Sequence, residues 1–288
     1  MQIILNTENI TQQFSTNILF KNINIEIIKG ELLGIIGGNG TGKTTLFKIL
    51  SGIIEPTKGK VWLRKEDVSG PHLISIKKEL QKKIGFAAQI PSFYQELTVQ
   101  QNLSYFAKMY NLPKRAINRN IITAMLLVGL SEEKDKVACN LSGGKQKALD
   151  IACALVHNPS ILILDEPTAD LDQTIKKQIL EVIRKINQNG KTIIISSHHM
   201  DEIRSLCTRV LLIEQKEIKE FSFFKNITLE LENKDYTGII LELSRNNIKN
   251  QVQENQLIIK TQNLELELYY LSNIIFKRKE KIISLDIN

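Results

Sequence analysis

The chain has 288 residues, of which 42% are hydrophobic and 24% charged, a composition that excludes a disordered or fibrous protein. Its longest apolar runs, such as 121–130, are far shorter than the ~18–20 residues that span a bilayer, and no secretion signal is expected at Met1. The net charge of +7 comes from dispersed lysines, so a solvated face, or a weak attraction to anionic lipid, is favoured over a nucleic-acid site.

Residues 1–220 alternate between short β-branched runs and helical periodicity, which is typical of an α/β domain with a largely buried sheet. In the β-rich N-terminal part, Ile23, Ile25 and Ile27 alternate with polar residues and predict one half-exposed strand. The continuous apolar run 32–36 predicts a central strand. Similar runs recur later in the chain, at 161–164, 193–195 and 210–213.

The segment of about 73–140 is largely helical and is interrupted by Pro91 and Pro113. It separates the first central strand from the later apolar runs. We therefore predict an inserted helical subdomain here.

Residues 221–288 differ from the preceding part in composition and in the order of the expected elements, and we predict a small α+β domain there. The expected order is strand, helix, two strands, helix and strand, which is compatible with a ferredoxin-like fold. The expected ranges are 227–231, 236–243, 248–253, 257–260, 264–276 and 282–286. Nine basic residues balance nine acidic ones in this segment, which is poor evidence for a nucleic-acid arm.

Directly after the first central strand, the chain has the pattern of a phosphate-binding loop followed by a helix. Glycines let successive backbone N–H groups point into one concavity, and the helix N-terminus adds partial positive charge. Lys43 would contact the β- and γ-phosphates and Thr44 would ligate Mg²⁺. The expected ATP-binding residues are Gly37, Gly38, Asn39, Gly40, Thr41, Gly42, Lys43, Thr44 and Thr45.

Two acids follow the apolar run 161–164, at the carboxyl end of a buried strand where ligands bind in open α/β sheets. We expect Asp165 to hold Mg²⁺, directly or through water, and Glu166 to polarise the water that attacks the γ-phosphate. Alone, such a pair could simply be solvated acids that end a strand. The phosphate loop favours the catalytic interpretation.

Ser142, Gly143 and Gly144 precede an amphipathic helix. They could form a second anion-binding helix end or merely an N-cap with a tight turn, and the motif alone favours the cap. The position of the motif in the chain favours anion binding, because its helix leads through Asn158 and Pro159 into the strand that ends at Asp165.

Together, these motifs resemble those of the nucleotide-binding subunit of an ATP-binding cassette (ABC) transporter over residues 1–220. In this resemblance 37–45 is the Walker A loop, 141–145 the signature and 161–166 the Walker B strand. Gln89 corresponds to the Q-loop glutamine, Asp172 belongs to the D-loop (169–172), and His198 corresponds to the switch histidine. Phe14 is at the position where the family usually stacks an aromatic residue on adenine.

The resemblance implies an ATPase that binds Mg²⁺ and ATP between two subunits arranged head to tail. Ser142, Gly143 and Gly144 of one subunit would close over ATP held by Lys43 of the other, with Asp172 also at the nucleotide. Gln89 would sense the γ-phosphate, the lytic water or the metal ion.

The partners that the resemblance implies are a second nucleotide-binding subunit, identical or not, and separately encoded integral membrane subunits on whose cytoplasmic side the chain lies. The surface 91–109 would meet the membrane subunits. The sequences of segments 97–103 and 109–113 are similar to those of single-cassette exporters of the drug, lantibiotic-immunity and sodium-efflux kind. Residues 221–288 would then be a dimerising or regulatory domain, or a packing flap.

Several positions depart from the family pattern. Ala148 and Cys153 replace arginines that are common on the signature helix, which puts local ion pairs and turnover in doubt, and Gln101 replaces a usual glutamate. We expect Cys153 and the two other cysteines to be reduced, buried thiols. His198 and His199 should face opposite ways at a strand end, with His199 and His72 at the surface.

Two alternatives remain open from sequence: a soluble cassette ATPase that acts on DNA or the ribosome, and a nucleotide-gated module with slow turnover. DNA-repair relatives need a long coiled coil between the loop and the signature, and translation factors usually carry two cassettes. Neither feature is present in this sequence. The transported substrate lies beyond what this chain encodes.

Overall fold

The computed structural model describes residues 2–63, 73–221, 225–246, 248–261, 264–278 and 280–287. The chain separates into two compact units, Met1–Phe221 and Ser222–Asn288. Each unit has its own core of buried aliphatic and aromatic side chains.

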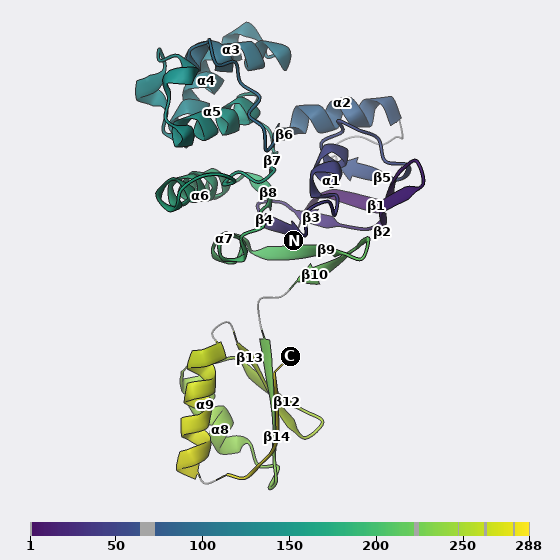
Figure 1. Ribbon diagram of the computed structural model, residues 1–288, viewed down its shortest axis with the longest axis vertical. Helices are drawn as coiled ribbons and strands as arrows, with labels where there is room; N and C mark the ends of the chain where they lie inside the picture. Colours follow the sequence, from purple (N-terminus) through teal and green to yellow (C-terminus); the bar gives the residue numbers. More distant parts are fainter. Residues whose placement is uncertain are drawn as a thin grey trace. The chain divides into compact units, whose positions relative to one another are not determined.

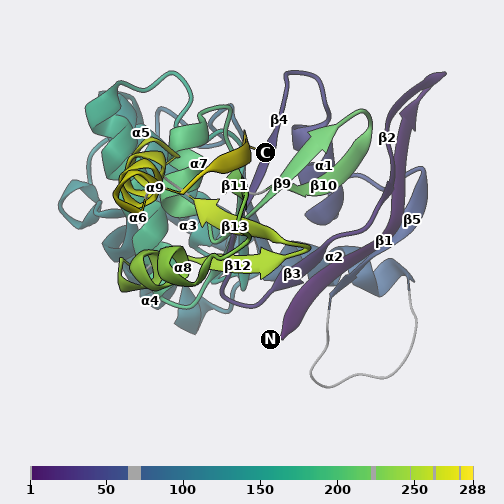
Figure 2. The same cartoon turned by 90° about the horizontal axis from the view of Figure 1, so that it is seen from below.

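An antiparallel sheet begins the first unit, and its long strand β1 (Ile3–Phe14) pairs with all three other strands described in it (Figure 2). These are β2 (Asn17–Ile23), β3 (Glu26–Ile28) and β5 (Lys58–Leu63). The single strand expected over Ile23, Ile25 and Ile27 is therefore wrong: the chain leaves β2 at Ile23 and enters β3 at Glu26. All three isoleucines are nevertheless buried, so the alternation indicated the buried face correctly.

The central sheet has the order β10-β9-β4-β8-β7-β6 in the part of the chain that the structure describes. All neighbouring pairs are parallel except β9 with β10, which form a hairpin. The apolar runs form strands buried on both faces, as parallel sheets require. The bounds are β4 (Leu32–Gly37), β6 (Ile84–Ala87), β7 (Ile161–Leu164), β8 (Thr192–Ser196), β9 (Arg209–Glu214) and β10 (Glu217–Phe221).

Helices α3, α4 and α5 pack against one another and form the helical part of this unit (Figure 1). Helix α2 instead packs on β5 and β6, so the helical packing begins at Val99 and not at residue 73. The bounds are α1 (Lys43–Leu50), α2 (Leu73–Lys83), α3 (Val99–Met109), α4 (Lys114–Val128), α5 (Gly143–Leu155), α6 (Gln173–Gln188) and α7 (Met200–Leu206), with short 3₁₀ turns at Ser131–Glu133 and Ala138–Asn140.

The start of α3 explains one departure from the family pattern. The Thr98 hydroxyl accepts a hydrogen bond from Gln101 N, and Gln101 Oε1 accepts one from Thr98 N, at 3.1 and 2.9 Å. This reciprocal arrangement is a capping box, in which glutamine serves as well as glutamate. Gln101 therefore caps the start of α3 although it differs from the usual glutamate.

Across the described residues, the structure contains no helix of the length and apolar character needed to cross a membrane. The three cysteines are free thiols, and burial raises the pKa of Cys207 to about 12. Cys153 is buried as expected, whereas Cys139 is exposed and corrects the expectation for that residue.

The second unit is an antiparallel sheet in the order β12-β13-β11-β14, with α8 and α9 on one face (Figure 1). Its element order and strand order are those of a ferredoxin-like fold, which confirms the fold expected from the sequence. The bounds are β11 (Lys225–Leu231), α8 (Thr237–Arg245), β12 (Asn250–Gln253), β13 (Gln256–Thr261), α9 (Leu264–Arg278) and β14 (Ile282–Ile287).

Candidate nucleotide site

The phosphate loop lies between β4 and α1 and depends on glycine. Gly42 has φ +101°, and a Cβ there would lie 2.8 Å from the Leu19 side chain, so both backbone and space require glycine. The buried Lys43 amine donates to the carbonyl oxygens of Gly37 and Gly38, at 2.8 and 3.2 Å. The loop thus places a lysine amine and a helix N-terminus at one concavity, the arrangement that binds phosphate.

Asp165 follows β7 and is almost fully buried. Its Oδ2 accepts a hydrogen bond from the Thr44 hydroxyl at 2.5 Å, and its Oδ1 accepts one from the Ser196 hydroxyl at 2.7 Å. A hydroxyl and a carboxylate oxygen therefore meet at the start of α1. Such hard oxygen donors are the ligands that Mg²⁺ prefers, so these residues fit a magnesium ion.

Glu166 is held in an unusual backbone conformation. Its φ is +49°, in the left-handed region that side-chain-bearing residues rarely adopt, and its N–H donates to the Ser196 hydroxyl at 2.9 Å. Its Oε2 lies 2.8 Å from His198 Nδ1. The strained backbone and this side-chain contact fix the direction of the carboxylate, as is common at functional sites.

These groups line one pocket of about 520 Å³. Phe14 and Leu19 from the antiparallel sheet flank it, Gln89 borders it after β6, and Glu166 and His198 face it from the ends of β7 and β8. Its lining residues are Phe14, Leu19, Asn39, Gly40, Gly42, Lys43, Thr44, Thr45, Gln89, Asp165, Glu166 and His198.

Ser142, Gly143 and Gly144 do not belong to this pocket's lining. They begin α5, which packs with α3 and α4 away from α1 (Figure 1). Ser142 occupies the N-cap position, but among the described residues its exposed hydroxyl makes no capping hydrogen bond. Ser142 is therefore the N-cap by position but not through its side chain, which leaves its hydroxyl without a partner at the helix end among the described residues.

Asp172 also lies outside the pocket's lining, and its carboxylate caps α6 by accepting from Thr174 N and Ile175 N, both at 2.9 Å. The same turn supports the start of α5, because a Cβ on Gly144 would lie 2.7 Å from the Ile175 side chain. Asp172 thus caps α6, and the first turn of α6 lies against the start of α5 through Ile175.

His198 and His199 do not face opposite ways as expected, because β8 ends at Ser196 and strand alternation ends with it. Their ring centroids are 4.0 Å apart. Their partners differ: His198 contacts Glu166, whereas His199 Nε2 lies 2.8 Å from the Lys176 amine. His199 is half-buried, and His72 lies outside the described residues.

Comparison with known proteins identifies the family. Residues 20–169, more than half of the chain, match the sequence profile of the family described as ABC transporter. The chain belongs to this family.

Its relatives include a resistance protein and an import protein. The linearmycin resistance ATP-binding protein LnrL of Bacillus subtilis is 34% identical over 216 residues, which are 75% of this chain and 68% of the relative. The methionine import ATP-binding protein MetN of Clostridioides difficile is 32% identical over 227 residues, 78% of this chain and 70% of the relative.

A dimeric ATP-binding cassette, MJ0796, solved in a post-hydrolysis state with ADP and Pi, superposes with a TM-score of 0.65 at 25% identity. The match covers 76% of this chain and 98% of that one. The ABC fold and an ATP-binding ATPase are thus established for this chain. Subunits of this family dimerise and work with separate transmembrane components.

This ABC subunit carries a buried ionic cluster that sequence reasoning missed. Asp150 Oδ1 accepts from Ser92 N and from the Ser92 hydroxyl, both at 2.9 Å, while its Oδ2 lies 3.9 Å from the Lys147 amine. Lys147 also donates to the carbonyl oxygens of Ala88 and Gln89, at 3.3 and 3.5 Å. Lys147 and Asp150 therefore join the signature helix to the Q-loop.

Replacing Lys147 by methionine should lower the free energy of unfolding by about 3–5 kcal/mol, the cost of leaving one partner of a buried ion pair alone. Desolvation raises the pKa of Asp150 and lowers that of Lys147, so each charge depends on the other. Urea unfolding followed by circular dichroism measures the loss.

The double variant Lys147→Met/Asp150→Asn should regain most of this stability, because it leaves no buried charge and keeps an acceptor for Ser92. The control is Lys145→Met, which changes an exposed lysine on the same helix that pairs with Glu133. Equal stabilities of the two lysine variants would contradict the importance of the buried pair.

Proposed function

We propose that the chain is the ATP-hydrolysing subunit of a membrane transporter and that it binds Mg-ATP between two subunits arranged head to tail. One observation carries the proposal: the pocket is lined by residues of the phosphate loop, both acids and His198, whereas the signature lies outside this lining and its Ser142 is exposed. One chain thus presents two halves of different sites. A second subunit would complete each of them.

Each pocket residue has a proposed task. Lys43 and the loop N–H groups bind the β- and γ-phosphates, and Phe14 stacks on the adenine. Thr44 and Asp165, with Gln89 beside them, would hold Mg²⁺, which supplies charge neutralisation on the phosphates. Gln89 also contacts the attacking water.

Glu166 accepts the proton of that water as it attacks the γ-phosphate. His198 keeps the carboxylate aimed at the water through the contact with Glu166 Oε2. Loss of the γ-phosphate then weakens the closed dimer, so hydrolysis resets a mechanical switch. Asp172 contributes by capping α6, whose first turn lies against the start of the signature helix.

We further propose that the membrane subunits dock on the surface 91–109 and its immediate surroundings. Ile90 is 80% exposed and Met109 is 61% exposed, which leaves large apolar side chains in water. Tyr94 and Tyr105, in the same segment, pack edge to face with ring centroids 4.8 Å apart, and the Tyr94 hydroxyl donates a hydrogen bond to the Tyr105 hydroxyl. Exposed apolar and aromatic groups of this kind mark protein interfaces.

We propose that transport is outward, because segments 97–103 and 109–113 are similar in sequence to exporters and LnrL is a resistance protein. The chain would then lie on the cytoplasmic face of the membrane.

Affinity purification of the tagged full chain from detergent-solubilised membranes tests the assignment. An integral membrane protein should co-purify, and Tyr105→Glu should abolish its recovery. Leu126→Glu, an exposed change on α4, is the control and should leave recovery intact. Recovery of DNA or ribosomes in place of a membrane protein would support the soluble alternative. ATPase activity that the reconstituted membrane protein stimulates would exclude a slow nucleotide-gated module.

A further inference from the structure

The two edges of the C-terminal sheet differ in chemistry. The edge strand β12 is short and carries mainly asparagine and glutamine. The opposite edge, β14, pairs only with β11 among the described strands, and it exposes Ile282, Ile283 and Leu285 at 45, 59 and 39%. A free edge with exposed apolar side chains is a template for another strand.

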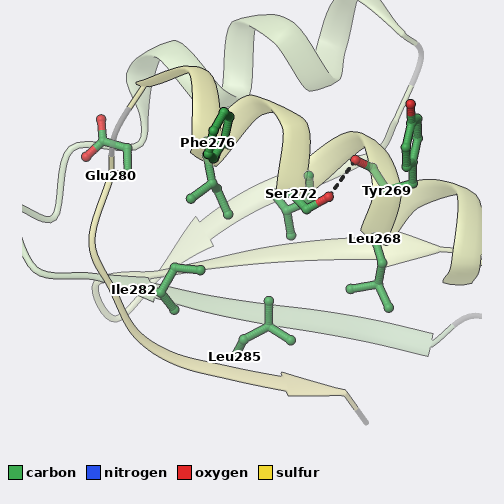
Figure 3. A pocket seen from close by; sticks show the side chains of 9 residues that line it. Leu268, Tyr269, Ser272, Phe276, Glu280, Ile282 and Leu285 are labelled. Carbon is green, nitrogen blue, oxygen red and sulfur yellow. Dashed lines mark hydrogen bonds between the residues drawn. The ribbon is translucent and has the colours of Figure 1, made fainter.

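A groove of about 1000 Å³ runs between α9 and β14 (Figure 3). Ile282 and Leu285 form its sheet side, and Leu268, Ser272 and Phe276 come from α9, with Phe276 85% exposed. The register of β14 shifts between Ser284 and Ile282, so Ile282 and Leu285 lie opposite the core residues Leu231 and Leu229. This bulge puts both side chains on the groove face.

We propose that β14 pairs antiparallel with β14 of a second copy of this chain, joining the two sheets into one. The register places Lys281 of each copy opposite Asp286 of the other, and Ile282 opposite Leu285. These contacts occur twice, related by the two-fold axis that a dimer of identical chains requires. The groove of each copy then receives apolar side chains of its partner.

The faces of the strand support this register. Directly opposite residues in an antiparallel pair lie on the same face. Ile282 and Leu285 share the groove face, whereas Asp286 alternates to the other face, as does Lys281, which forms an ion pair with Glu232 at 3.3 Å. Charge and apolar character are thus both self-complementary, which favours a second copy as the occupant.

This pairing does not involve the nucleotide. If the proposed function holds, it keeps two cassettes in one complex after hydrolysis has opened the ATP sites. The effective concentration of one cassette near the other would then reach the order of millimolar. The cassettes could close again without a new encounter.

Sedimentation analysis of the full chain without nucleotide tests the pairing. The wild-type protein should dimerise. Lys281→Glu and Asp286→Lys should each weaken the dimer by about tenfold or more, because each puts two like-charged pairs across the axis. An equimolar mixture of the two variants should regain the wild-type affinity, since every cross-pair is again opposite in charge. Recovery in the mixture also shows that both variants are folded.

Two controls isolate the interface. Glu232→Gln removes the partner of Lys281 within its own chain and should leave the dimer unchanged. Lys249→Glu changes a charge beside β12 and should also have no effect. A wild-type protein that is monomeric at about 100 µM without nucleotide, or a dimer that neither single variant weakens, would overturn the proposal. Because no ATP is present, failure here leaves the proposed ATP site untouched.

Discussion

The Glu166→Gln protein is expected to bind ATP normally and to hydrolyse it about 10²–10⁴-fold more slowly, the usual contribution of a general base. Glutamine has nearly the same shape but cannot accept the proton of the attacking water. The backbone bond from Glu166 N to the Ser196 hydroxyl remains, so the pocket keeps its geometry. Phosphate release under saturating ATP, together with binding of a fluorescent ATP analogue, separates the chemical step from binding.

The same variant, combined with Lys281→Glu so that β14 does not pair, should accumulate as an ATP-dependent dimer in gel filtration, because the γ-phosphate that bridges the two subunits is no longer removed. Glu181→Gln, on the exposed face of α6, is the matched control and should hydrolyse at the wild-type rate. Wild-type turnover in Glu166→Gln would remove this residue from the role of base. Loss of ATP binding would instead assign it a structural role.

Much of the fold could be predicted because its signals are local. The loop between β4 and α1 and the acids after β7 each depend on a few consecutive residues whose strand or helix is visible in the hydrophobic pattern. The six elements of the second unit are predictable for the same reason: each is a short segment with an apolar periodicity, bounded by polar residues. Local periodicity does not reveal where a strand stops, which is why the pattern of Ile23 and Ile27 predicts one strand where the structure has two.

Contacts between distant segments could not be predicted from one sequence. Ser196 bonds Asp165 and Glu166 across thirty-one and thirty positions, and nothing in the neighbourhood of Ser196 indicates this. Lys147 and Asp150 look like surface residues in an amphipathic helix, yet both are buried and both contact the segment 88–92. Their burial depends on tertiary packing, which overrides the local pattern.

The division of the site between two chains leads to a second large effect. A Ser142→Arg chain should bind ATP in its own Lys43 pocket as tightly as the wild type, because Ser142 is not among that pocket's lining residues. Its hydrolysis should nevertheless fall by about 10²–10³-fold, the loss typical when a donor to transition-state charge is removed. The bulky side chain would occupy the helix end that closes over the partner's ATP.

In the background Glu166→Gln/Lys281→Glu, where β14 does not pair, Ser142→Arg should also prevent the ATP-dependent dimer from forming. Ser142 is exposed and its hydroxyl makes no capping bond within the described residues, so the substitution should leave stability nearly unchanged. Ser131→Arg, at an exposed 3₁₀ turn, controls for added bulk and charge. If Ser142→Arg reduced ATP binding by a single chain, the signature would serve the nucleotide of its own subunit. If the variant instead keeps ATP binding but loses the ATP-dependent dimer and turnover, the signature serves the partner's site.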